Sequence, residues 1–366
     1  MHIVPVGVGR GYEVVIGDGT LQTVGERIRG LTGAEKVALI TAETGGGLFG
    51  VDVDTALARA GFTVVPMTVP AGESSKSWSM AGDILEALAT YGIGRGDVVV
   101  ALGGGVVGDL AGFVAATYMR GIDFVQVPTT LLAMVDSSVG GKTGVDLDAG
   151  KNLAGAFKQP LLVVADTSTL SELSEDEWRS GLAEVAKSAV IDGEEFLGWL
   201  EENAAALMER DSDAVAEAVG RCVAFKARIV GGDEREEGPR ECLNYGHTLG
   251  HAIEKAAGYG SVPHGLAVAE GMRFEIRVAM ELAGAEIGFV KRQDRLLDDL
   301  GLPPLEVRLH ATEVHAAMRG DKKVRRGVVR MVLPSAPGRW QCVEVADATI
   351  SAHLVEWASG KKGDQQ

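Results

Sequence analysis

Histidines at helical spacing make residues 240–265 the strongest candidate for chemistry in this chain. The stretch holds three of the chain's seven histidines. We predict a helix over residues 240–257, in which four polar side chains follow at steps of four, three and four residues and so share one face: Arg240, Asn244, His247 and His251. His264 follows a turn and precedes a second predicted helix, 265–283, so a short reversal of the chain returns its ring to that face. Two imidazoles from two helices are then available to one divalent ion.

A carboxylate for the same ion is offered by the segment GLAEVAKSA, where Glu184 and Lys187 are three residues apart and share a helix face. Such a pair is more often an ordinary surface ion pair. Two imidazoles and one carboxylate with an open position, however, form a catalytic metal set. The residues alone leave the nitrogen ligands open, because His247 and His251 at i, i+4 also match the pair of an H-E-x-x-H site. For each histidine the alternative is a structural role with satisfied hydrogen bonds.

A glycine turn follows an apolar run at residues 97–102. Gly103, Gly105 and Gly108 satisfy G-x-G-x-x-G, a pattern that lets backbone N–H groups approach a pyrophosphate at the start of a helix. Alone the pattern is weak, since glycines after a strand often form only a turn, and this turn does not follow the first strand. An acidic partner for a ribose is therefore expected upstream, in the loop at residues 70–76.

The next segment, VPTTLLAMVDSSVGGKTGVDLDAGKNLAGAF, is too polar and glycine-rich for plain scaffolding. Its two threonines stand at a strand end, where open α/β sheets bind ligands. Hydroxyls, backbone amides and a lysine occur together in SSVGGKTG, as in a phosphate or carboxylate site. It is not a P-loop, because Asp136 occupies the place of the opening glycine. We predict loop surroundings for the charged and amide residues of this segment: Asp136, Lys142, Lys151 and Asn152.

Further cations flank this region in the sequence. Arg120 precedes it, and three lysines follow much later, where the commoner assignment is a solvated surface lysine: Lys226, Lys322 and Lys323.

Composition excludes several classes of function. The net charge of −16 argues against nucleic-acid or acidic-membrane binding, although a local lysine cluster can still hold an anionic ligand. Three widely spaced cysteines favour a reducing compartment. The N-terminus lacks the pattern of a secretion signal, and the most apolar stretch, 98–119, is broken by Asp109 and glycines. We expect a soluble, cytoplasmic protein with no membrane or nucleic-acid partner.

At 366 residues the chain is long enough for two domains. Residues 1–170 alternate apolar runs with helical stretches, which predicts an α/β domain with a Rossmann-like, mostly parallel sheet. Its predicted strands are 36–41, 63–69, 97–102, 123–127 and 161–165. Residues 171–366 are predicted to be mainly α-helical, with helices at 176–190, 194–210, 214–229, 240–257, 265–283 and 290–301 and a late strand at 328–333.

Several longer motifs occur in a fixed order along the chain: GGGVVGDLAGF, YMRG, VPTTLLAMVDSSVGGKTGVD, GKNLAGAF, GLAEVAKSA, RECLNYGHTLGHAIE and HGLAVAEGM. Together they resemble the 3-dehydroquinate synthases, over nearly the whole chain. The resemblance implies a Rossmann-like N-terminal domain that binds NAD, a helical C-terminal domain and an active site between them. It implies Glu184, His247 and His264 as ligands of one divalent metal ion, zinc or cobalt, and His251 as a substrate-side residue. A homodimer is also expected.

The resemblance further implies which residues meet the small molecules. NAD contacts fall on Glu73, Lys76, Gly104, Gly105, Val106, Val107, Gly108, Asp109, Thr129, Thr130, Lys142, Lys151, Thr169 and Glu172. Substrate contacts fall on Arg120, Asp136, Lys142, Asn152, Lys187, Lys226, Arg240, Asn244, His251 and Lys322 or Lys323. Two departures from the family pattern concern NAD: ELSEDE replaces the usual Thr-Leu-Pro-x-Arg-Glu at residues 172–177, and Ala42 replaces an Asp or Asn.

The implied reaction converts 3-deoxy-D-arabino-heptulosonate 7-phosphate to 3-dehydroquinate and phosphate. Transient oxidation by NAD at C5 acidifies the C6 hydrogen and permits loss of phosphate, after which re-reduction and an intramolecular aldol step close the ring. Other sugar-phosphate cyclases, which make 2-deoxy-scyllo-inosose or 2-epi-5-epi-valiolone, remain alternatives, and so does a metal-dependent polyol dehydrogenase. A nucleotide-binding sensor without activity would have no use for a complete metal and phosphate constellation.

Overall fold

The computed structural model describes residues 1–319 and 328–360 and divides them into two compact units. The first unit contains residues 1–174 and 212–235, and the second contains residues 175–211 and those from 236 onward. A single boundary near residue 170 therefore does not describe the division. Helix α7 (Ser212–Gly232) returns to the first unit because its apolar face, which includes Val215 and Val219, is buried where the helix packs against the first two strands.

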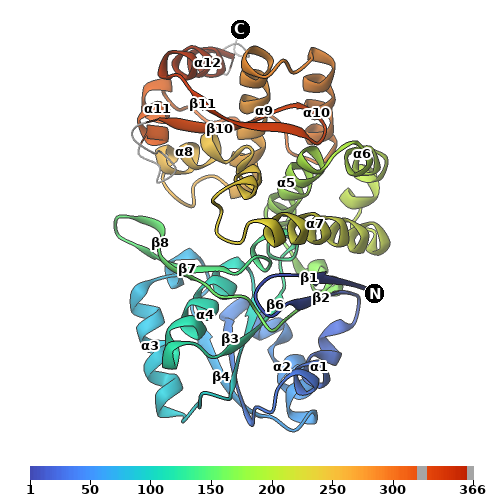
Figure 1. Ribbon diagram of the computed structural model, residues 1–366, viewed down its shortest axis with the longest axis vertical. Coiled ribbons are helices and arrows are strands. Elements are labelled where there is room, and N and C mark those ends of the chain that lie inside the picture. Colours follow the sequence, from blue (N-terminus) through green and yellow to red (C-terminus); the bar gives the residue numbers. More distant parts are fainter. Residues whose placement is uncertain (320–327, 361–366) are drawn as a thin grey trace. The chain divides into compact units, whose positions relative to one another are not determined.

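The first unit is built on a seven-stranded sheet in the order β1-β2-β9-β6-β5-β3-β4 (Figure 1). The first two strands pair antiparallel and all other neighbours pair parallel, which confirms the predicted mostly parallel sheet. The strands are β1 (His2–Val6), β2 (Tyr12–Gly17), β3 (Lys36–Ala42), β4 (Thr63–Val69), β5 (Val98–Gly103), β6 (Asp123–Pro128) and β9 (Leu162–Asp166). The five strands predicted from the sequence match β3, β4, β5, β6 and β9 to within a residue at each end.

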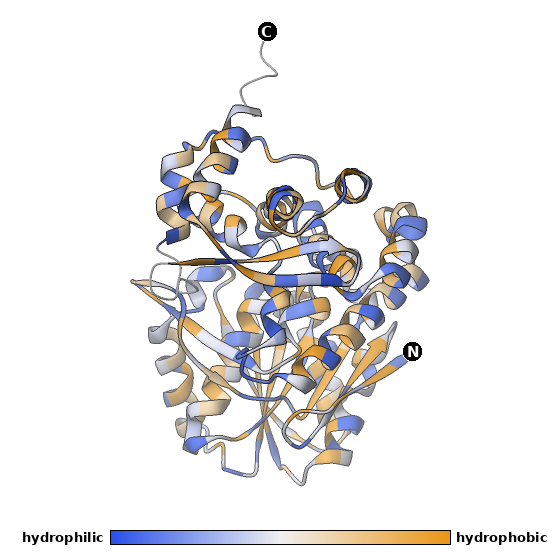
Figure 2. Ribbon diagram, turned by 45° about the horizontal axis from the view of Figure 1, so that its top comes forward, coloured by the Kyte–Doolittle hydropathy of each residue, from blue (hydrophilic) through white to orange (hydrophobic). Residues whose placement is uncertain are grey.

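The central strands are hydrophobic along their whole length because helices cover both faces of the sheet. In β5, Val99 and Ala101 face one buried cluster with α3 (Trp78–Thr90) and α4 (Gly105–Thr117). Val98, Val100 and Leu102 face the other cluster, which includes residues of α1 (Val24–Leu31) and α2 (Glu43–Arg59). Figure 2 shows the hydrophobic colouring along these strands.

The segment that the sequence predicted as a loop forms a hairpin of β7 (Lys142–Leu147) and β8 (Gly150–Phe157). The loop prediction for Lys142, Lys151 and Asn152 is therefore wrong. Glycines weaken a strand signal, yet here they allow two backbones to approach: a Cβ on Gly144 would lie 2.8 Å from the Ala154 carbonyl oxygen. Asp136 lies in a short π-helical turn, Ala133–Ser137.

The second unit is mainly helical, as predicted. One two-stranded sheet, β10 (Val329–Ala336) with β11 (Arg339–Val345), accompanies its helices: α5 (Glu175–Asp192), α6 (Glu194–Met208), α8 (His247–Ala257), α9 (His264–Leu282), α10 (Ile287–Asp299), α11 (Ala311–Arg319) and α12 (Asp347–Gly360). The last two helices and β11 were not among the predicted elements. Within the described ranges, no helix has the length and apolar character needed to cross a membrane.

Candidate metal centre and nucleotide site

The histidine segment is not one helix. A 3₁₀ helix, Pro239–Asn244, ends before Gly246, whose φ of 79° is left-handed, and α8 begins only at His247. A Cβ at Gly246 would lie 2.6 Å from the Val268 carbonyl oxygen on α9, so only glycine fits this turn. The predicted continuous helix over 240–257 is therefore wrong, and Arg240 and Asn244 do not share a helix face with the two histidines.

Three imidazoles nevertheless gather where α8 and α9 begin. His247 and His251 lie one turn apart on α8, with ring centroids 5.3 Å from each other. His264 is the first residue of α9, and its ring centroid is 5.5 Å from that of His247 and 6.2 Å from that of His251. The short chain reversal predicted from the sequence is confirmed.

Glu184 on α5 supplies the carboxylate. Its Oε1 lies 3.4 Å from Nε2 of His247 and 3.6 Å from Nε2 of His264, while Lys187 forms an ion pair with Oε2. The side chains of Glu184 and Lys187 are 1% and 2% exposed, so they are not an ordinary surface pair. One atom from each of Glu184, His247 and His264 lies within 4.8 Å of the others, close enough to hold one ion.

The second ring nitrogen of each of these two histidines has a partner of its own. His247 Nδ1 donates to the carbonyl oxygen of Tyr245 at 3.1 Å, and His264 Nδ1 donates to Oε2 of Glu254 at 3.4 Å. With Nδ1 donating in this way, Nε2 is the nitrogen of each ring that faces Glu184 and that, when deprotonated, can bind a metal ion. A set of two imidazole nitrogens and one carboxylate fits zinc or cobalt.

A second group with the same spacing consists of His251, Glu254 and His264. Within the part of the chain that the structure describes, neither group contains both His247 and His251. Among the described residues, the H-E-x-x-H-like pairing that the sequence left open therefore has no carboxylate to complete it, and the geometry fits the ligand set Glu184, His247 and His264.

The acid groups around His264 also set its protonation. Burial lowers the pKa of His264, but hydrogen bonds to Glu184 and Glu254 outweigh burial and raise the pKa to about 10. A proton therefore competes with a metal ion for this imidazole.

In the first unit, the glycine turn lies where the sequence predicted it, between the end of β5 and the start of α4. Gly104 is the residue before the helix, and a Cβ there would lie 3.1 Å from the Thr130 methyl carbon. A Cβ on Gly105 would lie 3.0 Å from Oγ of Ser137. A Cβ at either position would crowd its neighbour, and a helix start without side chains is what a pyrophosphate site requires.

Four of the predicted NAD-binding residues form two ion pairs close to this turn. Lys76 Nζ lies 2.5 Å from Oδ2 of Asp109, and Lys151 Nζ lies 3.6 Å from Oε1 of Glu73. Burial lowers the pKa of Lys76, but the charge and hydrogen bond of Asp109 outweigh burial, so the pKa is raised. Glu73 also acts electrostatically on both members of the buried pair, so the loop at 70–76 and the start of α4 form one charged cluster.

Asp136 and Lys226 form another pair in the first unit. Lys226 on α7 donates to the Asp136 carboxylate and to its backbone carbonyl, each at 2.5 Å. The Lys226 side chain is only 9% exposed, so it is not the solvated surface lysine that the sequence favoured. The charge of Lys226 also lowers the pKa of Asp109, although burial of Asp109 has the stronger, opposite effect. The pair of Asp136 and Lys226 therefore lies near the glycine turn.

The remaining predicted residues are placed separately. Thr130 Oγ1 accepts from the Ala133 N–H at 3.2 Å, and the buried Thr169 hydroxyl donates to the Asp166 carbonyl oxygen at 2.8 Å. The other predicted residues of the first unit are the buried Thr129, Val107 and Gly108, the half-buried Val106, and four exposed residues: Arg120, Lys142, Asn152 and Glu172. Lys322 and Lys323 lie outside the described residues.

Arg240 and Asn244 belong to the second unit. Arg240 is 1% exposed, and Asn244 Nδ2 donates to Oε1 of Glu236 at 2.6 Å. The sequence reasoning named neither Glu236 nor Glu254. Glu254 could have been found from its spacing, because it follows His251 by three residues in GHAIE. Glu236 lies in an acidic run, 233–237, where no spacing distinguishes one acid from the next.

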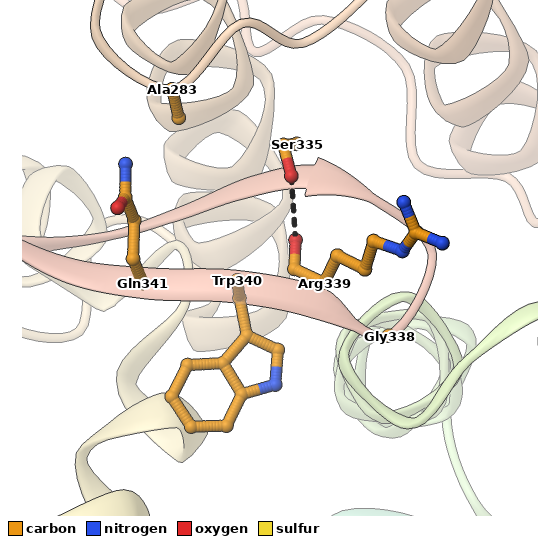
Figure 3. A pocket seen from close by; sticks show the side chains of 6 residues that line it. All are labelled: Ala283, Ser335, Gly338, Arg339, Trp340 and Gln341. Carbon is orange, nitrogen blue, oxygen red and sulfur yellow. Dashed lines mark hydrogen bonds between the residues drawn. The ribbon is translucent and has the colours of Figure 1, made fainter.

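A separate pocket of about 490 Å³ lies beside the β10–β11 hairpin (Figure 3). Ser335 Oγ donates to the Arg339 carbonyl oxygen across the hairpin, and Trp340 and Gln341 point to opposite sides of β11. None of the predicted site residues lines it, so we assign no part of the site to this pocket.

The fold and the site define a Rossmann-like α/β protein whose helical unit carries a candidate metal centre. A family model described as 3-dehydroquinate synthase N-terminal matches residues 66–180, and one described as 3-dehydroquinate synthase C-terminal matches residues 181–324. The chain belongs to the 3-dehydroquinate synthase family, and this makes it an enzyme of the cyclase and lyase type. A 3-dehydroquinate synthase of Caulobacter vibrioides is 46% identical over 97% of this chain and 99% of the relative.

Two solved structures are also similar over nearly their full lengths. A 2-deoxy-scyllo-inosose synthase complexed with carbaglucose-6-phosphate, NAD+ and Co2+ has a TM-score of 0.89 and 25% identity, covering 97% of this chain and 99% of its own. A 2-epi-5-epi-valiolone synthase of Streptomyces hygroscopicus with NAD+ and Zn2+ has a TM-score of 0.86 and 27% identity, covering 95% and 97%.

Proposed function

We propose that this chain converts 3-deoxy-D-arabino-heptulosonate 7-phosphate to 3-dehydroquinate and phosphate. The observation that carries the proposal is the largely buried group of Glu184, His247 and His264 in a chain of the 3-dehydroquinate synthase family. The reaction needs a Lewis acid beside a nicotinamide cofactor, and this chain has a donor set for the first and a glycine turn for the second.

We assign NAD to the first unit and the divalent ion to the second. The glycine turn at Gly104 and Gly105 suits the pyrophosphate, and the charged cluster of Glu73, Lys76 and Asp109 stands beside it. NAD+ in the two similar cyclase structures, with Co2+ or Zn2+, supports this assignment. Bound NAD supplies reversible oxidation at C5 of the substrate, and the bound ion supplies Lewis acidity toward the C4 and C5 hydroxyl groups.

The protein's cations are assigned to the two anionic ends of the substrate. Arg240, with Lys226, suits the C1 carboxylate, because a guanidinium binds a carboxylate bidentately. The phosphate is assigned to Lys142, Asn152 and Lys187, with Lys322 or Lys323. Holding both ends favours one elimination over the several futile ones open to a mobile substrate.

Two side chains are assigned to proton movement. His251 stands beside the candidate metal ligands, 5.3 Å from His247 between ring centroids, but outside the group that holds the ion. Asp136 is fixed by its hydrogen bond from Lys226. An imidazole and a carboxylate in these positions suit proton transfer to and from the substrate's hydroxyl groups, and the leaving phosphate is a further base for the C6 proton.

The test measures phosphate release from the heptulosonate phosphate by the purified chain. Release should require both NAD and a divalent ion, stop after a chelator, and resume when zinc or cobalt is added back. Free NADH should not accumulate, because NAD is reduced by the substrate and reoxidised when the hydride returns within one turnover. A metal- and NAD-loaded protein that releases no phosphate would rule the activity out.

Arg240→Ala tests the carboxylate assignment. It should lower kcat/KM for the natural substrate far more than for an analogue without the C1 carboxylate. Equal losses on both substrates would remove this role from Arg240.

A second candidate is another sugar-phosphate cyclase, which the TM-score of 0.89 to 2-deoxy-scyllo-inosose synthase favours. Glucose 6-phosphate, which lacks a carboxylate, would then release phosphate faster than the heptulosonate phosphate. A polyol dehydrogenase would instead accumulate free NADH with a polyol. The expected homodimer and cytoplasmic location stay predictions, and light scattering after size-exclusion chromatography tests the first.

A further inference from the structure

Two buried carboxylates beside the candidate metal centre have no role in the proposed chemistry. Glu254 on α8 is 7% exposed and Glu275 on α9 is 0% exposed. Burying a carboxylate is costly unless hydrogen bonds satisfy it, so the partners of these two side chains indicate what they do. Each carboxylate contacts a group that belongs to the other helix and that bears on a metal-binding imidazole.

Glu254 acts on the ring of His264. Its Oε2 accepts the hydrogen bond from Nδ1 of His264 at 3.4 Å, across from α8 to α9. The opposite ring nitrogen, Nε2, lies 3.6 Å from Oε1 of Glu184. A carboxylate that accepts from Nδ1 fixes the tautomer and limits rotation of the ring. It also makes Nε2 a stronger electron-pair donor to a metal ion.

Glu275 acts on the backbone that carries His247. Its Oε2 accepts from the N–H of Gly246 at 2.9 Å, and its Oε1 accepts from the N–H of Thr248 at 3.2 Å, so the two bonds flank His247. These groups belong to the start of α8, where backbone N–H groups lack partners within the helix and favour an anion. The same turn includes the Tyr245 carbonyl, which accepts from Nδ1 of His247.

We propose that Glu254 and Glu275 are positioning residues, each of which orients an imidazole carried by the opposite helix so that both Nε2 atoms face Glu184. The inference rests on the proposed metal centre and adds the residues that preorganise it. Glu254 acts directly on a ring, whereas Glu275 acts through the backbone. Removing such partners in metal sites weakens metal affinity about 10–100-fold.

The test measures affinity for Zn2+ by competition with a chromophoric chelator, using the full chain without substrate, together with the ligand-field absorption of the Co2+ form. Glu254→Ala should weaken Zn2+ affinity about 10–100-fold and change the Co2+ spectrum. Glu254→Gln should lose less, because its amide oxygen still accepts from His264 Nδ1. Partial rescue by the conservative variant separates orientation of the ring from simple filling of space.

Glu275→Gln and Glu275→Asp test the second carboxylate. In the glutamine variant, an NH2 group replaces one carboxylate oxygen and meets a backbone N–H that needs an acceptor. In the aspartate variant the charge remains, but the side chain is one methylene too short to reach both N–H groups. Both should weaken Zn2+ affinity about tenfold or more. If the glutamine variant fails to fold, the aspartate variant decides, and wild-type affinity in it would overturn the role of Glu275.

Glu270→Gln is the matched control. Glu270 is on the same helix, is 4% exposed, and accepts from the Leu305 N–H at 2.9 Å and from the Trp357 indole at 2.5 Å. Its substitution removes a buried carboxylate without touching the imidazoles, so Zn2+ affinity should stay within about twofold of wild type. NAD affinity, measured separately, should be unchanged in every variant.

Three further results would overturn the inference. Wild-type Zn2+ affinity and an unchanged Co2+ spectrum in Glu254→Ala would remove the role of Glu254. Two ions per wild-type chain, with one lost in Glu254→Ala, would make Glu254 a ligand of a second site with His251 and His264. Equal weakening by Glu270→Gln would show a general packing effect. Failure of the wild-type chain to bind Zn2+ at all would instead defeat the proposed function.

Discussion

The charged groups of the two units are organised in opposite ways. In the first unit, three lysines of the predicted site each have a carboxylate partner: Lys76 with Asp109, Lys151 with Glu73, and Lys226 with Asp136. In the second unit, Lys187 pairs with one oxygen of Glu184, and the other oxygen converges on one place with ring nitrogens of His247 and His264. Balanced pairs suit a ligand that carries charges of both signs, such as a dinucleotide. Converging lone pairs are satisfied only by a cation or a proton.

The two sites also arise from different backbone architecture. The proposed nucleotide site uses strand ends and a helix start, which the parallel sheet places side by side. The candidate metal centre depends on glycines at which the backbones of neighbouring helices are in close contact. A Cβ on Gly265 would lie 2.2 Å from the Ser180 Cα on α5, and one on Gly271 would lie 1.8 Å from the Gly246 carbonyl oxygen. We therefore expect the metal centre to be the more sensitive of the two to small backbone changes.

The largest effect is expected for His247→Ala. Loss of one imidazole should remove the ion and lower the rate of phosphate release about a thousandfold or more, because metal catalysis contributes several kcal/mol. NAD affinity should not change, since the proposed nucleotide site belongs to the first unit. Metal content, phosphate release and NAD titration measure the three quantities.

His251→Ala is the comparison for this variant. It should keep one ion per chain while phosphate release falls, because His251 is assigned to proton movement. If His251→Ala lost the ion and His247→Ala kept it, the ligand assignment would be wrong.

Lys76→Met should destabilise the chain by about 3 kcal/mol, because it leaves the largely buried Asp109 carboxylate without its cation. NAD affinity should also fall, while Zn2+ affinity stays at the wild-type value. Chemical denaturation and ligand titration measure both. The double variant Lys76→Met/Asp109→Asn should recover part of the stability, and a double variant as unstable as the single one would contradict the pairing.

The same pair makes stability depend on pH. The pKa of Lys76 is raised above its ordinary value of 10.5, so the folded state holds this proton more tightly than the unfolded chain does. The pair's contribution is complete below pH 10.5 and is lost as the pH rises through the folded pKa. As the pH rises above 10.5, the free energy of unfolding should therefore fall more for the wild type than for Lys76→Met. Equal decreases in the two proteins, measured by denaturation, would contradict this.

Gly271→Ala should cost about 2 kcal/mol and weaken Zn2+ binding, because the added methyl group meets the Gly246 carbonyl oxygen and pushes the start of α8 away from α9. Gly288→Ala is the control, since a Cβ at Gly288 on α10 meets nothing within 4 Å. It should be neutral or stabilise the chain by up to about 1 kcal/mol. Thermal unfolding with chelator competition measures both, and equal behaviour of the two variants would refute the close-contact argument.

The smallest effect is expected for Arg292→Met, away from both sites. Arg292 donates to the carboxylates of Glu194 and Glu201, and its hydrogen bond lowers the pKa of Glu194. All three side chains are substantially exposed to water, so the cost should be about 1 kcal/mol and should shrink at high salt. Metal and NAD affinities should stay unchanged. A large, salt-independent loss of stability in urea denaturation would show that these ion pairs contribute more than exposed ion pairs do.

The sequence alone identified the α/β first unit, the helical second unit and the glycine turn, because these depend on local hydrophobic period and on strand–turn–helix order. It failed at the β7–β8 hairpin, where glycines that weaken a strand signal are required by backbone contact. It also failed at Gly246, where a helical spacing of polar residues runs through a left-handed turn. Both errors have one cause: a neighbouring segment, remote in the sequence, decides the local conformation.

Residue type and spacing by themselves determined that this chain carries imidazoles and a carboxylate able to share an ion, and which motifs mark its family. Only the tertiary structure decided that His247 and His264, seventeen residues apart, present Nε2 to the same oxygen of Glu184. Only the tertiary structure, too, showed Glu254 and Glu275 reaching across to the opposite helix. Ligand geometry depends on how helices cross, and crossing depends on contacts between residues that no local pattern relates.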